Sequence, residues 1–192
     1  MYRPKTSNSL SVKEHNPFGL KMGMSLEDVK TLAPDITYRE EHDVYTSYVV
    51  PAPHPLFDLY YFKIDRVYGL YSIQAGTRSI EDEYGNLLRE QFNDLAARLS
   101  PKYGNSRFKN VTVNQPIWIE KDEWLASIFQ GEREYYSYWS KDSKGSMGKD
   151  LLEVHLSLVA LSHTSGILLL KYVFTNSVDV ASRLSKSYDD VL

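Results

Sequence analysis

The feature that most limits the fold is a pair of strand-like runs with almost nothing between them. Residues 57–64 (FDLYYFKI) and 67–73 (VYGLYSI) are rich in β-branched and aromatic residues, and only Asp65 and Arg66 separate them. A connection this short permits an antiparallel hairpin and excludes the long crossover that parallel strands need. We therefore expect a hairpin here, extended to an antiparallel meander by residues 44–50 (VYTSYVV).

A second antiparallel pair is expected near the end of the chain. Residues 151–162 (LLEVHLSLVALS) alternate, so apolar side chains lie on one face while Glu153, His155 and Ser157 lie on the other. Residues 166–174 (GILLLKYVF) follow after a short turn and pair with this strand. On this reading His155 is a surface or cross-strand residue.

The first helix is expected at residues 26–33. Ser25 is a favoured capping residue, and Glu27 and Asp28 place negative charge in the first turn, where it is stabilising. Pro34 ends the segment. A helix cap explains the stretch FGLKMGMSLEDVKTLAP without any bound ligand.

The main helix is expected to begin after a cap formed by Ser79 and Asp82 and to end in PKYG, at Pro101 to Gly104. Apolar residues recur there at helical spacing; they are Tyr84, Leu87, Leu88, Phe92, Leu95 and Leu99. A weaker last helix follows Asn176. Together these elements predict an α+β fold, with a mostly antiparallel β-sheet and two main helices packed on one face.

Domain organisation and compartment follow from composition. The chain has 192 residues, 42% of them hydrophobic, which suits one domain. Residues 1–16 are polar and without periodicity, so they are interpreted as a mobile N-terminal arm before a single domain at 17–192. Cysteine is absent, which excludes disulfides and fits the cytoplasm. No signal peptide or membrane-spanning run is expected.

The charge balance limits the class of partner. The chain carries 22 basic and 25 acidic residues, a formal net charge of -3, and so lacks the strong positive field of a nucleic-acid binder. We expect neither nucleic acid nor membrane as partner, and another protein instead.

Motifs for chemistry are few. The segment REEHD, from Arg39 to Asp43, contains His42 and precedes His54, and this cluster could hold a metal ion or act as acid and base. Its spacing matches no ligand motif, so a charged turn is the other interpretation. GSMGKD lacks the first glycine of a phosphate loop and has Asp150 where a hydroxyl is required. We expect no catalytic residue, no metal and no cofactor.

Residues 105–150 are the least readable part of the chain. The segment IWIE, residues 117–120, is compatible with a strand, and SKDSKGSMGKD, residues 140–150, reads as a mobile loop.

The unusual compositional feature is aromatic, with 15 Tyr and 3 Trp. These side chains offer a large rigid area with a polar tip and are enriched at interface hot spots. The densest run is YYSYW, and with the preceding tryptophan it supplies our candidate protein-binding residues, which are Tyr135, Tyr136, Tyr138, Trp139 and Trp124. The other interpretation is a Tyr-rich sheet whose alternation buries about half of them.

The motif GMSLEDV, then a strand meander, then a helix ending LAARLSPKYG, resembles the β-lactamase inhibitor protein and the small outer-membrane assembly lipoproteins. The resemblance covers Phe18 to about Gly104. It implies a bacterial module in which helices pack on an antiparallel sheet that binds another protein. This chain departs from it in having no cysteine and no second copy of the unit. Beyond Gly23, Met24 and Ser25 no position can be matched, so no functional residue is carried over.

Three functions remain open at this point. The preferred one is a non-enzymatic protein-binding module, acting as an inhibitor or as an immunity protein that neutralises a toxin. The alternative is a metal-dependent enzyme or a small-ligand-binding protein, with a site formed by His42, His54 and neighbouring carboxylates. The third is an assembly or adaptor role in a larger machine.

Overall fold

A single antiparallel sheet organises the protein in the computed structural model, which describes residues 15–141 and 147–189. Eight strands follow the order β1-β2-β3-β4-β9-β8-β7-β6, and β5 pairs with the start of β9. The strands are β1 (Thr37–Arg39), β2 (Val44–Ser47), β3 (Leu59–Asp65), β4 (Gly69–Gly76), β5 (Ile80–Glu81), β6 (Arg107–Thr112), β7 (Arg133–Ser140), β8 (Leu151–Ala160) and β9 (Ser165–Phe174). The helices are α1 (Leu26–Leu32), α2 (Asn86–Tyr103), α3 (Trp124–Phe129) and α4 (Ser177–Asp189).

The pairing of β4 with β9 joins two groups of strands into this sheet. One group is the meander β1 to β4, and the other comprises β6 to β9. The predicted α+β fold with an antiparallel sheet is therefore confirmed.

The predicted hairpin connects β3 to β4, and local side-chain chemistry explains its turn. The carboxylate of Asp65 accepts hydrogen bonds from the backbone N–H groups of Val67 at 2.8 Å and Tyr68 at 3.0 Å. Gly69 then adopts a left-handed φ of 68°, and a Cβ at this position would lie 2.3 Å from the carbonyl oxygen of Gly23. Only glycine fits so close to another backbone segment.

The first helix begins as predicted. Ser25 Oγ accepts a hydrogen bond from the N–H of Asp28 at 3.2 Å, and Asp28 Oδ2 accepts one from the N–H of Ser25 at 3.0 Å. This reciprocal capping box satisfies two backbone donors.

The main helix begins later than the pattern suggests. The carboxylate of Asp82 accepts hydrogen bonds from the N–H groups of Asn86 at 3.0 Å and Leu88 at 2.8 Å, so its predicted capping role is confirmed. Ser79 takes no part in the cap, because β5 separates it from α2. The helix ends before Gly104, as expected.

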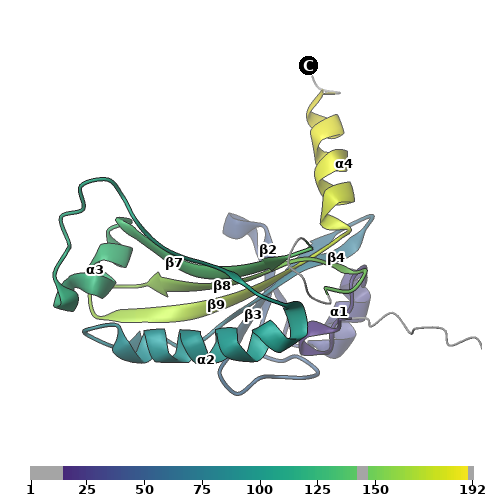
Figure 1. Cartoon of the computed structure of the whole chain (residues 1–192). Helices are drawn as coiled ribbons and strands as arrows, with labels where there is room; N and C mark the ends of the chain where they lie inside the picture. Colours follow the sequence, from purple (N-terminus) through teal and green to yellow (C-terminus); the bar gives the residue numbers. More distant parts are fainter. Residues whose placement is uncertain (1–14, 142–146, 190–192) are drawn as a thin grey trace, which may run out of the picture.

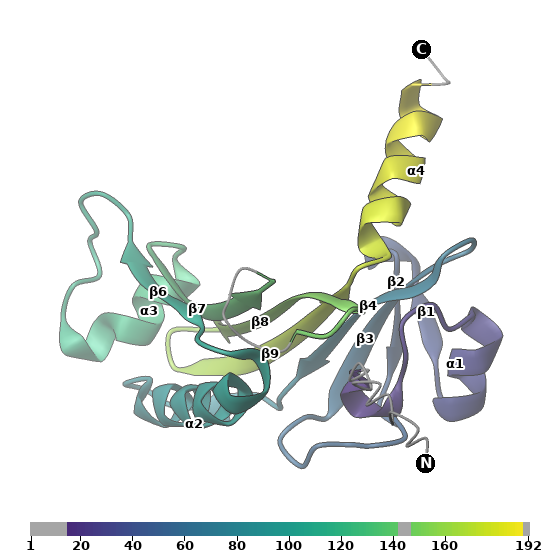
Figure 2. The ribbon, with the colours of Figure 1, turned by 45° about the vertical axis from the view of Figure 1, so that its right-hand side comes forward.

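The helices lie on both sides of the sheet. Figures 1 and 2 show α2 across one face, under β7, β8 and β9, whereas α4 rises on the opposite side. Buried residues of α1 and α2 belong to one core cluster with the strands, which agrees with two helices on one face. The last helix, expected to be weak, spans 13 residues and projects away from the sheet. The short helix α3 has no counterpart in the sequence prediction.

The core lies between the sheet and the helices α1, α2 and α3. It draws on alternate residues of the strands and one stripe of α2. Its largest fully buried side chains are Trp139, Tyr60, Phe62, Phe92, Phe174, Leu20, Leu70, Ile73, Leu88, Leu125, Leu151 and Leu156.

The N-terminal arm was predicted for residues 1–16, of which residues 1–14 lie outside the described part of the chain. His15 is buried; its backbone N–H donates to Asp150 Oδ2 at 3.0 Å, and its ring lies 5.4 Å from that of Tyr103. The chain is therefore packed against the core from residue 15 onward.

The middle of the chain contains two strands that the sequence did not predict, β6 and β7. IWIE does not form a strand, and Ile117 and Ile119 are 79% and 67% exposed in the connection before α3. Of the predicted mobile loop, residues 142–146 lie outside the described part of the chain. Within the described ranges, no helix has the length and apolar character needed to cross a bilayer.

Candidate functional site

The aromatic run YYSYW forms most of β7, and strand alternation divides it between two faces. Tyr135 and Trp139 point toward α2, where they are 7% and 0% exposed. Trp124 opens α3 and is 7% exposed. These three side chains are thus buried in the core and present almost no surface to a partner, and their role as protein-binding residues stays a prediction.

The contacts of the three buried aromatics explain their position. The indole N–H of Trp139 donates to the carbonyl of Gly104 at 2.9 Å. The Tyr135 ring lies 4.8 Å from Phe92 of α2 and 5.1 Å from Trp124, both in edge-to-face geometry. Such pairs stabilise a core beyond the area they bury.

Tyr136 and Tyr138 lie on the other side of the sheet, opposite α2, which we call the open face. Both side chains are half-buried. Their role as protein-binding residues stays a prediction, to which this position offers partly exposed side chains.

A continuous line of polar and amphipathic side chains crosses the open face. Each member is the cross-strand partner of the next, so the line runs perpendicular to the strands. From β6 to β1 these residues, called the central row, are Arg107, Tyr138, His155, Lys171, Gln74, Tyr61, Thr46 and Thr37.

Neighbouring members of the central row are held in contact at its β6 end. Arg107 Nη1 donates to Tyr138 Oη at 3.3 Å, and the guanidinium carbon lies 5.7 Å from the centre of the Tyr138 ring. Tyr136, one position off the row, places its ring 5.0 Å from His155 and 6.2 Å from Tyr138. The aromatic rings are therefore ordered before any partner arrives.

The open face has an excess of positive charge. Strand alternation places five basic side chains on it, Arg39, Lys63, Arg107, Lys109 and Lys171, and four acidic ones, Asp65, Glu81, Glu134 and Glu153, of which Asp65 pairs with Arg183 of α4. This balance has the opposite sign to the net charge of the whole chain, which is -3.

His155 lies next to Lys171 in the central row. Burial lowers the pKa of the His155 imidazole below its ordinary value of 6.5, and Lys171 lowers it further, while Glu153 acts in the opposite direction. His155 is therefore a neutral imidazole at neutral pH, available as both donor and acceptor.

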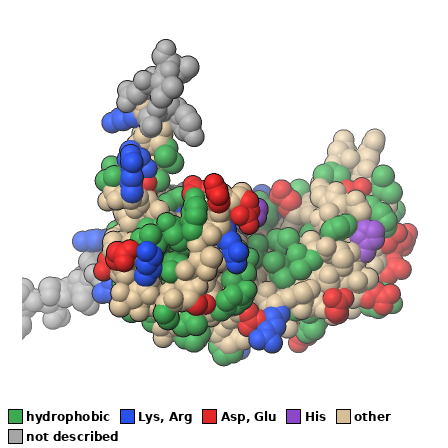
Figure 3. Space-filling view, turned by 180° about the vertical axis from the view of Figure 1, so that it is seen from behind, with side chains coloured by type: hydrophobic (Ala, Val, Ile, Leu, Met, Phe, Trp, Pro, Cys, Tyr) green, Lys and Arg blue, Asp and Glu red, His purple; other side chains and the backbone are tan. Residues whose placement is uncertain are grey.

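Acidic side chains gather elsewhere. Seen from behind, they crowd the end of the molecule that holds α3 (Figure 3), where Glu81, Glu83, Glu120 and Asp122 are exposed. Charge is therefore segregated between this end and the middle of the open face.

Among the described residues, the histidines and carboxylates proposed as a site do not gather into a group that could hold a metal ion. His42 lies before β2 and His54 lies in the loop after it, so the strand separates them. Both residues are exposed overall, although the His54 ring lies 5.5 Å from that of Phe57. Within residues 15–141 and 147–189, no group of three or more His, Asp or Glu side chains could hold a metal ion.

Several members of the central row were not singled out from the sequence. Arg107 lies on β6, which gave no strand signal because all its residues are exposed. Lys171 interrupts the apolar run GILLLKYVF, and His155 stands among polar residues on its strand. Because these two strands were expected to pair, His155 and Lys171 could have been recognised from the sequence as cross-strand neighbours at the centre of the row.

In comparisons with known proteins, no family model, no curated protein and no solved structure matches this chain. The resemblance to the β-lactamase inhibitor protein and the assembly lipoproteins therefore stays a prediction. Function has to be inferred from the geometry described above.

Proposed function

We propose that the chain is a non-enzymatic, cytoplasmic protein-binding module whose open face docks onto an acidic surface of another protein. The observation that carries this proposal is the central row, which spans the main sheet and contains aromatic and basic side chains but no carboxylate. An inhibitor or toxin-immunity role is the form of this function that we favour.

The residue types of the row support recognition of protein. Tyrosine and arginine are the side chains most enriched at interface hot spots, and their rings and guanidinium are already positioned by mutual contacts. Lys171 and Arg107 supply charge complementarity, which favours an acidic partner and speeds association.

A protein partner is favoured over nucleic acid on grounds of charge. Nucleic-acid binding depends on neutralising several phosphates in a strongly positive field. The strands of the open face offer five basic side chains against four acidic ones, one of which, Asp65, is paired with Arg183, in a chain whose net charge is -3.

The proposal is tested by capturing the partner from source cells with the wild-type chain, purifying it, and measuring the dissociation constant by calorimetry. Tyr138→Ala combined with Lys171→Ala should weaken binding by about 30-fold or more, because truncating hot-spot residues costs about 2 kcal/mol or more. The matched control, Tyr84→Ala with Lys30→Ala, removes the same residue types from exposed positions outside the strands and should leave affinity unchanged.

Two results would contradict the proposal. Wild-type affinity in the Tyr138/Lys171 variant would show that the partner binds elsewhere. Micromolar binding of single-stranded nucleic acid, with loss in the same variant and no protein partner recovered, would assign the open face to a different class of ligand.

A further inference from the structure

A cleft lies on the opposite side of the sheet from the central row. It is bounded by the N-terminal segment, the β2–β3 loop, the second half of α2 and β9, with a volume of about 640 Å³. This volume falls within the range of roughly 300–1,000 Å³ that is typical of small-molecule sites. Its lining includes an apolar set, which is Phe18, Phe57, Leu95, Leu99, Leu170 and Tyr172.

The wall of the cleft that contains Phe18 is held rigidly. Phe18 adopts a left-handed φ of 56°, which is uncommon for a residue other than glycine. Its carbonyl accepts a hydrogen bond from the N–H of Ala52 at 3.1 Å, and a Cβ on Gly19 would lie 2.7 Å from Pro51. The Phe18 ring is thereby fixed in edge-to-face contact, 5.0 Å from Tyr60. A backbone outlier over-determined by its surroundings is a feature that clusters at ligand sites.

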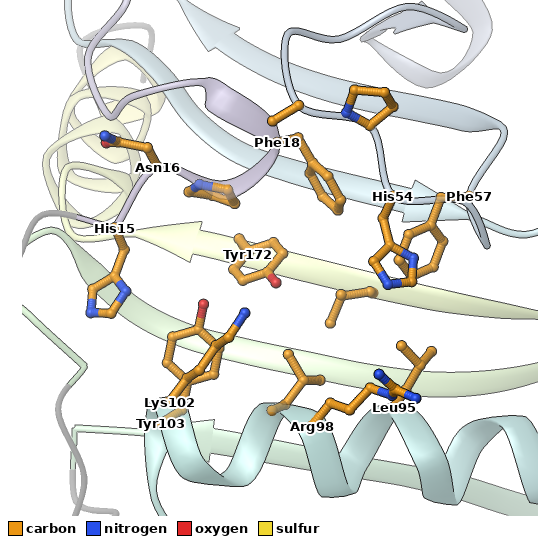
Figure 4. A pocket seen from close by; sticks show the side chains of 15 residues that line it. His15, Asn16, Phe18, His54, Phe57, Leu95, Arg98, Lys102, Tyr103 and Tyr172 are labelled. Carbon is orange, nitrogen blue, oxygen red and sulfur yellow. The ribbon is translucent and has the colours of Figure 1, made fainter.

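The β2–β3 loop is also preorganised. Its segment PAPHP contains three prolines, each of which fixes one backbone dihedral. His54 stands between two of them and directs its ring toward the cleft (Figure 4). A rigid wall loses little conformational entropy when a ligand binds.

Basic groups line the cleft opposite this wall. Arg98 and Lys102 extend from α2, one helical turn apart, and Figure 4 shows them on the side facing His54. Burial lowers the pKa of the His54 imidazole, and the positive charges of Arg98 and Lys102 lower it further. Among the fifteen described residues that line the cleft, none is Asp or Glu.

Two phenols complete the polar part of the cleft. Tyr103 and Tyr172 lie with ring centres 6.2 Å apart. Burial raises the pKa of both hydroxyls, and the Tyr103 neighbour adds to the rise at Tyr172. Both therefore stay protonated and uncharged at neutral pH, and because the two hydroxyls hydrogen-bond to each other, one O–H of the pair is left to donate.

We propose that this cleft binds a small organic anion with an aromatic or other apolar body. The apolar floor would cover the body, while Arg98 and Lys102 would bind the anionic group through charge-assisted hydrogen bonds. The apolar body of such a ligand matches the apolar part of the lining, and its anionic group matches the basic part. A cation would instead meet the positive charges of Arg98 and Lys102, with no carboxylate among the described lining residues to balance them.

Nearby carboxylates do not remove this positive character. Asp94 pairs with Arg98 at 2.8 Å, but both side chains are more than half exposed, and such surface pairs exchange readily with another anion. Asp150 accepts the backbone N–H of His15 and is not among the residues that line the cleft.

The test uses 2-naphthoate as the probe and naphthalene-2-carboxamide as its uncharged counterpart, with binding measured by calorimetry on the full chain. We expect saturable binding of naphthoate, and at least about tenfold weaker binding of the amide, because only the carboxylate makes charge-assisted contacts. Arg98→Gln with Lys102→Gln should reduce naphthoate affinity to that of the amide. The control variant, Lys30→Gln with Arg66→Gln, removes the same amount of positive charge from residues that do not line the cleft. It should bind naphthoate as the wild type does.

Three results would overturn the proposal: no saturable naphthoate binding at millimolar concentration, equal affinity for the amide, or an equal loss in the control variant. The His54 ring proton signal must also shift on titration of the wild-type chain with naphthoate. Far-ultraviolet circular dichroism verifies that the variants are folded. Because the cleft and the central row lie on opposite faces, the Arg98/Lys102 variant should retain full affinity for the protein partner.

Discussion

Replacing Trp139 by Phe, and separately Tyr138 by Phe, tests the assignment of adjacent aromatics to opposite faces. Trp139 is fully buried and its indole N–H donates to Gly104, whereas Tyr138 is half-buried on the open face. Trp139→Phe loses one hydrogen bond, about 1 kcal/mol, and removes buried apolar atoms worth about 1–2 kcal/mol more. The free energy of unfolding should fall by about 2–3 kcal/mol in total.

Tyr138→Phe removes only a hydroxyl whose hydrogen bond with Arg107 is exposed to solvent. Its effect should stay within about 0.5 kcal/mol, as for most surface substitutions. Urea unfolding, monitored by far-ultraviolet circular dichroism, distinguishes the Trp139→Phe and Tyr138→Phe variants. A difference of about 2 kcal/mol in the free energy of unfolding shifts the urea midpoint by about 1 M at an m-value near 2 kcal/mol/M. Equal losses in both variants would refute the assignment of faces.

Two further predictions concern backbone packing and pH. Gly85→Ala should destabilise the fold by about 1–3 kcal/mol more than Gly131→Ala in urea unfolding, because both residues have positive φ but only at Gly85 would the new Cβ lie 2.4 Å from Trp124; equal costs would argue against this contact. His155→Gln should flatten the loss of stability as pH falls below 6.5. Since the folded pKa of His155 is lowered, mainly by burial, the unfolded chain takes up the proton first, and the wild type loses this contribution on acidification. Unfolding curves at pH 7 and pH 5 check it, and parallel curves for the two proteins would contradict it.

Local rules were sufficient where a segment determines its own structure. The two-residue separation at Asp65 and Arg66 required a hairpin, and Ser25 with Asp28 formed the expected capping box. Asp82 caps α2 because its carboxylate accepts hydrogen bonds from the first backbone N–H groups of the helix, which have no partner within the helix itself. None of these features depends on distant residues.

Sequence alone could not assign the aromatic run to a face. Alternation predicts that Tyr135 and Trp139 share one face while Tyr136 and Tyr138 share the other. Because both sets are aromatic, the sequence does not indicate which set faces the core. The choice is made by α2, whose Phe92 packs on Tyr135. That contact joins elements more than forty residues apart in sequence, so no local pattern reports it.

The strand β9 links the two proposed sites, since Tyr172 faces the cleft and Lys171 belongs to the central row. A register slip of one residue would exchange these faces and destroy both sites together. The register is held by side chains of β4 and the residue after it. Ser72 Oγ donates to the carbonyl of Tyr172 at 3.1 Å, and Thr77 Oγ1 accepts from the N–H of Leu168 at 3.1 Å. These two buried hydroxyls therefore stabilise the arrangement on which both binding proposals depend, although neither is proposed to contact a ligand.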